Sequence, residues 1–155
     1  MSFARFRAAA LRYVSAVLDS PLQFAVFLFG VWFTLNGVIA FGVYPDMAFG
    51  HSMHACTIQF LGFIPVTVNG WHALFHLVTG LLGLVLAPAR TRATRYLLAN
   101  GPFYLLIALL GFVGGDNVLR VMAVDTFGSV VHAIEGAVMV ILGATAVIRG
   151  RSARR

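Results

Sequence analysis

The chain has 155 residues, of which 60% are hydrophobic and only 10% are charged. Soluble domains carry about 25% charged residues, so this composition excludes a disordered chain and argues against a soluble globular domain. Eleven basic and five acidic residues give a formal net charge of +6. The lone Cys56 can form neither an internal disulfide nor a Cys-based zinc site. The sequence therefore predicts an integral membrane protein.

Residues 1–20 predict an amphipathic helix that lies on the inner leaflet of the membrane. On a 3.6-residue period, apolar side chains gather on one face and polar side chains on the opposite face. The apolar face holds Phe3, Phe6, Ala10, Tyr13, Val14 and Val17, and the polar face holds Arg5, Arg12, Ser15 and Asp19. Ser20, Pro21 and Gln23 then match the start of a new helix, with Ser20 as its N-cap.

Four apolar stretches follow, at residues 22–43, 71–87, 96–114 and 128–148. About 20 helical residues are needed to cross a hydrocarbon core of about 30 Å, so each stretch is predicted to span the membrane, although the second is short. The predicted fold class is an all-α membrane protein, with a bundle of four transmembrane helices in residues 21–148. Residues 149–155 form a basic tail.

The positions of the Arg residues predict the orientation. Ten of the 11 lie before the first stretch, between the second and third, or after the fourth. Because cytoplasmic loops are enriched in Arg and Lys, both termini are predicted to be cytoplasmic, in a bacterial inner membrane. Only Arg120 lies on the outer side. Topology and contact with anionic lipids account for the basic charge, so we expect no nucleic-acid partner.

The longest connection, residues 44–70, is predicted to lie on the outer side. Residues 58–68 are largely apolar but are interrupted by Gly62 and Pro65, so we expect an interfacial or re-entrant cover over the bundle. The same connection contains four soft ligands of the kind that Cu(I) favours, although loops also gather such residues by chance. These outer-loop copper candidates are His51, Met53, His54 and Cys56.

Histidines within the spans are the main candidate functional residues, because ionisable groups in hydrocarbon are costly. His72 and His76 share one face of the second span, and His132 lies near the start of the fourth. From the helical rise, His76 lies about 8 Å and His132 about 6 Å below the outer ends of their helices. We therefore expect one polar layer inside the bundle. Glu135 is a further candidate ligand, and the candidate supporting groups are Thr34, Asn36 and Asn69.

Four interpretations of this layer are open. A transition metal would use His72, His76 and His132 as ligands, with Glu135 as an oxygen ligand or as the acceptor that orients a histidine. A b-type haem would use His132 and either His72 or His76 as axial ligands. A proton relay would pass through His76, His132 and Glu135. Alternatively, the histidines form only structural hydrogen bonds between helices.

Residues 68–84, with an Asn, then His72-x-x-x-His76 and a glycine-rich apolar run, resemble a family of small bacterial membrane proteins. This family has four helices, is common in actinobacteria and is catalogued as a domain of unknown function. The resemblance covers roughly residues 22–148 and includes His132. It implies a fold and a topology but no activity. Three positions depart from the family's usual residues: Gly128, Ser129 and Glu135.

These patterns predict a binding or accessory membrane subunit that holds a metal or haem in the histidine layer. The alternatives are a small transporter or proton-conducting subunit, or an assembly or scaffold protein in which the histidines are purely structural. No nucleophile motif, phosphate loop or recognisable carboxylate pair occurs, so hydrolase and kinase activities lack support. The expected partners are the lipid bilayer and either a second copy of the chain or a larger membrane complex.

Overall fold

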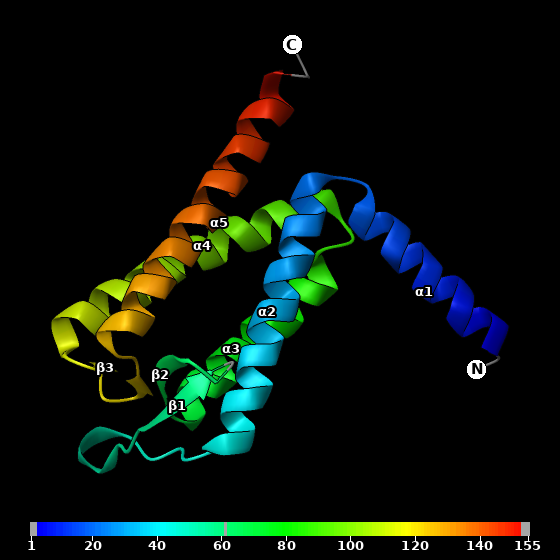
Figure 1. The fold of residues 1–155 in the computed structure, drawn as a ribbon. Coiled ribbons are helices and arrows are strands. Elements are labelled where there is room, and N and C mark those ends of the chain that lie inside the picture. Colours follow the sequence, from blue (N-terminus) through cyan, green and yellow to red (C-terminus); the bar gives the residue numbers. More distant parts are fainter. Residues whose placement is uncertain (1–2, 61, 153–155) are drawn as a thin grey trace.

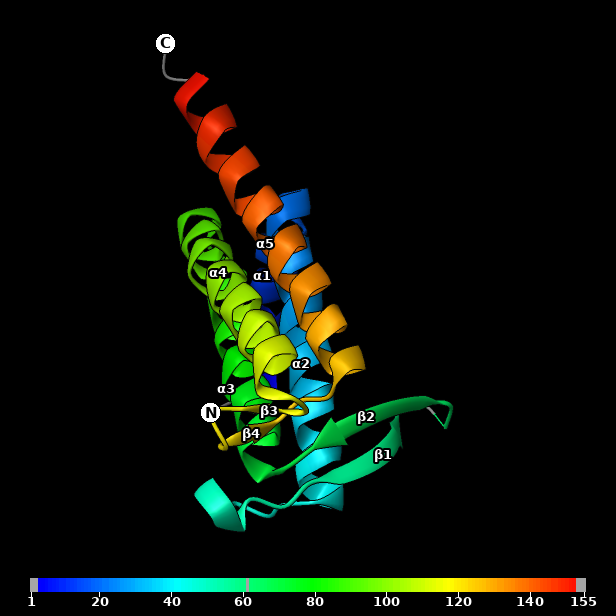
Figure 2. The same cartoon turned by 90° about the vertical axis from the view of Figure 1, so that its left-hand side faces the viewer.

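The computed structural model describes residues 3–60 and 62–152, and helices make up most of this part of the chain. Helices α2 to α5 form a bundle and α1 lies beside it (Figure 1, Figure 2). The α-helices are α1 (Phe3–Leu18), α2 (Pro21–Val43), α3 (Gly70–Leu86), α4 (Arg90–Gly114) and α5 (Thr126–Ser152).

Three of these helices, α2, α4 and α5, are long and apolar enough to cross a membrane. Helix α3 is also apolar but has only 17 residues. Helix α4 starts before the expected residue 96 and continues without interruption through Pro102. Helix α5 extends to Ser152, so part of the basic tail is helical. Arg154 and Arg155 lie outside the described residues.

Local capping explains where two of the helices begin. Ser20 adopts an extended backbone conformation and its side chain accepts a hydrogen bond from the Gln23 amide, while Pro21 occupies the first turn of α2. This confirms the predicted helix start. Asn69 caps α3 in the same way, because its side chain accepts from the His72 amide.

Helices α2 and α3 pack closely against each other, as do α4 and α5. A Cβ atom added at Gly136 of α5 would lie 2.8 Å from the Gly101 carbonyl oxygen of α4, so only glycine permits this approach. A Cβ at Gly30 of α2 would lie 2.7 Å from the Leu84 amide of α3. The bundle therefore consists of two closely packed helix pairs, and side chains such as Phe33 and Tyr104 fill the core between them.

Helix α1 leaves the start of α2 and runs sideways, away from the bundle (Figure 1). The Tyr13 hydroxyl donates to the Leu84 carbonyl at 2.6 Å, and Val17 is buried against the bundle. Phe3, Phe6 and Val14 of the predicted apolar face are exposed in the isolated chain. The structure thus shows the helix, while its contact with lipid stays a prediction.

Two short antiparallel hairpins at the end of the bundle where α3 and α5 begin correct the all-helical expectation. The first pairs β1 (Cys56–Phe60) with β2 (Ile64–Val68), and the second pairs β3 (Asn117–Val118) with β4 (Met122–Ala123). The first hairpin occupies the segment expected to cover the bundle, and its Thr, Ile and Val residues favour strands. Gly62 turns it with a φ of +82°. A short 3₁₀ helix, Gly50–Ser52, precedes it.

Candidate metal centre

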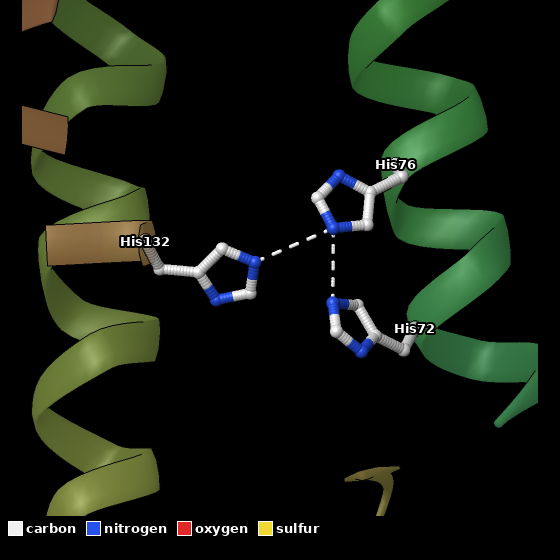
Figure 3. A group of neighbouring side chains, drawn as sticks. All are labelled: His72, His76 and His132. Carbon is white, nitrogen blue, oxygen red and sulfur yellow. Dashed lines mark hydrogen bonds between the residues drawn. The ribbon is translucent and has the colours of Figure 1, made fainter. Parts of the chain in front are cut away.

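The structure brings together the three histidines that the sequence singled out. His72 and His76 project from α3, and His132 projects from α5 (Figure 3). The three side chains are buried, with exposed fractions of 1%, 8% and 2%. His76 Nε2 lies 2.9 Å from His72 Nε2 and 3.3 Å from His132 Nε2. One nitrogen from each ring lies within 4.8 Å of the other two.

The outer nitrogens of two of the rings are held by the surrounding protein. His72 Nδ1 lies 2.7 Å from the Ala123 carbonyl, which can only accept, so Nδ1 carries the proton and Nε2 has a free lone pair when the ring is neutral. His76 Nδ1 lies 3.4 Å from the Tyr104 hydroxyl. His132 Nδ1 is buried without a hydrogen-bond partner. The arrangement places the Nε2 atoms of His72 and His132 close to His76 Nε2 and holds two of the rings from behind.

Asn69 orients His72 through the second hairpin. Its side-chain oxygen accepts from the amides of His72 and Ala123, and its amide nitrogen donates to the Val121 carbonyl at 2.7 Å. Asn69 is fully buried. It therefore links the first turn of α3 to the strand whose carbonyl holds the His72 ring.

Asp125 performs a similar linking function for the helix that carries His132. One carboxylate oxygen accepts from the Gly128 amide at 2.7 Å in the first turn of α5, and the other accepts from the Thr67 amide of β2 at 3.0 Å. The first hairpin is thereby attached to the start of α5. Sequence reasoning did not assign this role to Asp125, because its contact with Thr67 joins residues 58 positions apart.

Glu135 lies beside the histidines but not in the compact group of three. Its Oε1 accepts from the Trp32 indole nitrogen at 2.7 Å, and its Oε2 is buried without a partner. Asn36 lines the same cavity and donates to the Trp32 carbonyl at 2.8 Å. Thr34 lies against Gly80 where α2 meets α3, and its hydroxyl is buried without a partner.

The histidines and Glu135 line one cavity of about 100 Å³ between α2, α3 and α5. Ile64 and Val66 of β2 form part of its wall, so the first hairpin does cover the site. The lining is mostly apolar. Polar atoms in this cavity are therefore shielded from water. Their interactions with a bound ion are stronger in such an apolar site than in water.

The four outer-loop copper candidates do not form a comparable group among the described residues. His51 is exposed and lies 2.7 Å from the Arg120 guanidinium, while His54 lies 3.3 Å from the Asp46 carboxylate. The Ala48 amide and, to a lesser extent, His54 hold the pKa of Asp46 below its ordinary value. Cys56 is partly buried in β1.

Sequence reasoning missed a row of hydroxyl groups behind His76. The Tyr104 hydroxyl lies 3.0 Å from Thr79 Oγ1, and the Tyr96 hydroxyl donates to the Thr79 carbonyl at 3.1 Å. All three residues are buried. The sequence does show one Thr and two Tyr within otherwise apolar spans. Whether their hydroxyl groups meet depends on how α3 packs against α4.

A comparison with protein families matches residues 23–145 to the model described as "Domain of unknown function (DUF4383)". The chain belongs to the DUF4383 family. The matched region of this DUF4383 member contains the three histidines and Glu135, whereas α1 precedes it. Searches of curated proteins and of solved structures found no match. The family description assigns no activity, so a function has to be inferred from the geometry of the site.

Proposed function

We propose that this chain is a metal-binding or accessory subunit of the bacterial inner membrane that holds a transition-metal ion between His72, His76 and His132. The convergence of three buried Nε2 atoms from two helices carries the proposal. Tetrahedral zinc with Zn–N bonds of 2.0–2.1 Å needs N···N distances of about 3.3 Å. The 2.9 Å and 3.3 Å separations are close to this value, and the ligand atoms of all three residues lie within 4.8 Å of one another, so the rings would have to move together to bind one ion.

The surroundings of the rings support a metal ligand role. Metal-binding histidines usually donate their second ring N–H to a carbonyl, carboxylate or water, which fixes the ring orientation. The Ala123 carbonyl provides this acceptor for His72, and the Tyr104 hydroxyl can provide it for His76. Glu135 Oε2 lacks a partner and lines the same cavity, so it is the candidate for a fourth ligand.

The same geometry favours a metal ion over haem. The ring centroids of His132 and His76 are 5.3 Å apart, and the cavity has a volume of about 100 Å³. Pockets for drug-sized ligands have volumes of about 300–1,000 Å³, and a porphyrin needs space on this scale. A haem between these histidines would have to separate α3 from α5.

We further propose that all four bundle helices span the membrane, with both termini cytoplasmic and α1 on the inner leaflet. The Arg residues near the chain termini and between α3 and α4 support this orientation. Helix α3 is short, but α4 and α5 extend beyond it and local thinning of the bilayer accommodates a short helix. The histidine layer then lies toward the outer leaflet.

Metal analysis of the purified protein tests the site. The detergent-solubilised chain is treated with a chelator, incubated with Zn²⁺ or Cu²⁺, desalted and measured by mass spectrometry. We expect about one ion per chain, and we expect His132→Ala to lower the affinity by about tenfold or more. His51→Ala and His54→Ala are matched controls that should change nothing. Metal-free wild-type protein, or unchanged binding by His132→Ala, would refute the proposal.

The row of hydroxyls behind His76 favours a second candidate function, a proton-conducting subunit. Tyr104 and Thr79 extend a chain of polar atoms from the histidines into the bundle. Proton flux into liposomes that contain the purified chain tests this function. Flux that depends on Tyr104, and is lost in Tyr104→Phe, would support it, whereas flux equal to that of empty liposomes would exclude it.

A further inference from the structure

Two adjoining pockets lie at the end of the bundle opposite the histidine layer, where α4 begins and α5 ends. Their volumes are about 240 Å³ and 450 Å³, and both are lined by Arg90 and Ala146. A Cβ added at Gly143 would lie 2.8 Å from Leu98 Cδ2, whereas a Cβ at Gly150 would meet nothing within 4 Å. The two helices therefore separate beyond Gly143, and the last turns of α5 continue past the start of α4 (Figure 2).

Four Arg side chains line these pockets without an acidic partner among the described residues. Arg90 and Arg149 line the first pocket, and Arg95 and Arg151 join Arg90 in the second. Asp19, which lies just before α2, forms no ion pair with any of them, and their guanidinium groups form no hydrogen bond within residues 3–60 and 62–152. The positive-inside rule explains why Arg residues gather at this end of the bundle. It does not require them to converge from two helices on shared pockets.

We propose that these pockets bind one phospholipid with two phosphate groups, one held by Arg90 and Arg149 and the other by Arg95 and Arg151. The inference depends on the proposed spanning arrangement of the helices but not on metal binding. A guanidinium group presents its N–H donors in a fork that matches the oxygens of a phosphate. Because Arg90 lines both pockets, two phosphates that are linked through one head group can share it as a common contact.

The walls of the pockets favour a lipid over a free phosphate ion. Leu22 and Leu142 line the first pocket, and Leu98 and Val147 line the second. Each pocket therefore combines guanidinium groups with an apolar surface. A phosphate ion would contact only the charged groups, whereas a phospholipid also buries the first CH₂ groups of its chains against the apolar walls, which is favourable.

The start of α4 also favours an anion at this place. Its first turn contains no acidic residue, and Ala89 at the N-cap position makes no side-chain hydrogen bond. The N-terminal end of a helix carries a partial positive charge, so Arg90 and Arg92 are unfavourable there in the absence of an anion. A phosphate beside Arg90 accepts from the guanidinium group and offsets this repulsion. The bound head group thus stabilises the start of α4.

Native mass spectrometry of the full chain in detergent tests the proposal. The protein is titrated with cardiolipin, which has two phosphate groups, and separately with phosphatidylglycerol, which has one. We expect one cardiolipin per chain, bound about tenfold more tightly than phosphatidylglycerol. Arg90→Gln removes the group shared by both pockets and should weaken cardiolipin binding about tenfold, and Arg151→Gln should weaken it about fivefold. Arg92→Gln, on the same helix but outside both pockets, should change it less than about twofold.

Three results would overturn the proposal. Equal affinity for the two lipids would exclude recognition of two phosphates. An equal loss in Arg90→Gln and Arg92→Gln would show only a general attraction of this end to anionic lipids. Displacement of the lipid by inorganic phosphate or glycerophosphate at the same concentration would assign the pockets to a free phosphate.

Parallel measurements separate this site from the proposed function. His132→Ala should lose metal but keep cardiolipin. Lipid binding without metal in the wild type refutes only the metal site, and metal without lipid binding refutes only the lipid site. Extraction of native membranes with alkaline carbonate tests the spanning arrangement independently, because a chain that spans the bilayer stays in the membrane fraction.

Discussion

Replacing Asn69 provides a sensitive test of how the second hairpin holds the histidine cluster. Asn69→Ala removes three hydrogen bonds, to the amides of His72 and Ala123 and to the Val121 carbonyl. Asn69→Ser keeps a hydroxyl that can cap α3 but is too short to make all three contacts. The two variants therefore separate helix capping from attachment of the hairpin.

The expected loss of stability follows from these contacts. A buried hydrogen bond contributes about 1 kcal/mol, so Asn69→Ala should lower the free energy of unfolding by about 3 kcal/mol. Asn69→Ser should lower it by about 2 kcal/mol, because the cap is retained. Since the Ala123 carbonyl orients the His72 ring, both variants should also weaken metal binding, by about 10-fold to 100-fold.

Equilibrium unfolding in detergent and metal titration measure the two effects. Asn100→Ala is the matched control, because the Asn100 side chain donates only to the Tyr96 carbonyl one turn earlier in the same helix. This variant should change stability by less than about 0.5 kcal/mol. Equal stability of Asn69→Ala and Asn100→Ala would refute the linking role of Asn69. Lower stability with unchanged metal affinity would refute its effect on His72.

Gly136→Ala should lower the free energy of unfolding by about 1–3 kcal/mol, because the added Cβ meets α4 backbone. Gly150→Ala, on the same helix with nothing within 4 Å, should have no such cost, and equal unfolding curves would contradict the packing argument. The pKa of Asp46 is lowered in the folded protein, mainly by the hydrogen bond that its carboxylate accepts from the Ala48 amide. This bond therefore stabilises the loop fully at pH values above the ordinary pKa of Asp. The stabilisation is lost only when the pH falls through the lower pKa of the folded state. Protection of this amide from hydrogen exchange should therefore persist from pH 8 to about 5; loss of protection near pH 6 would count against it.

Local patterns in the sequence predicted most of the helical framework. Apolar runs indicated the helices of the bundle, and Ser20 correctly indicated where α2 begins. The spacing of four residues placed His72 and His76 on one face of α3, because that relation depends only on the helical repeat. The strands of the outer segment were missed, since a short apolar run fits either a strand or a buried helical segment.

The approach of His132 to the other histidines was expected from their helix faces and similar depth, and the tertiary structure decided that the rings lie within hydrogen-bond distance of one another. Apolar helices in lipid gain little from one apolar neighbour over another, so close glycine contacts determine which faces meet. The packing of one helix pair on the other brings Trp32 to Glu135 and the Ala123 carbonyl to His72, across 103 and 51 residues. Composition and helical period thus determined which residues lie inside the bundle, whereas the packing of one helix pair on the other determined the geometry of the site.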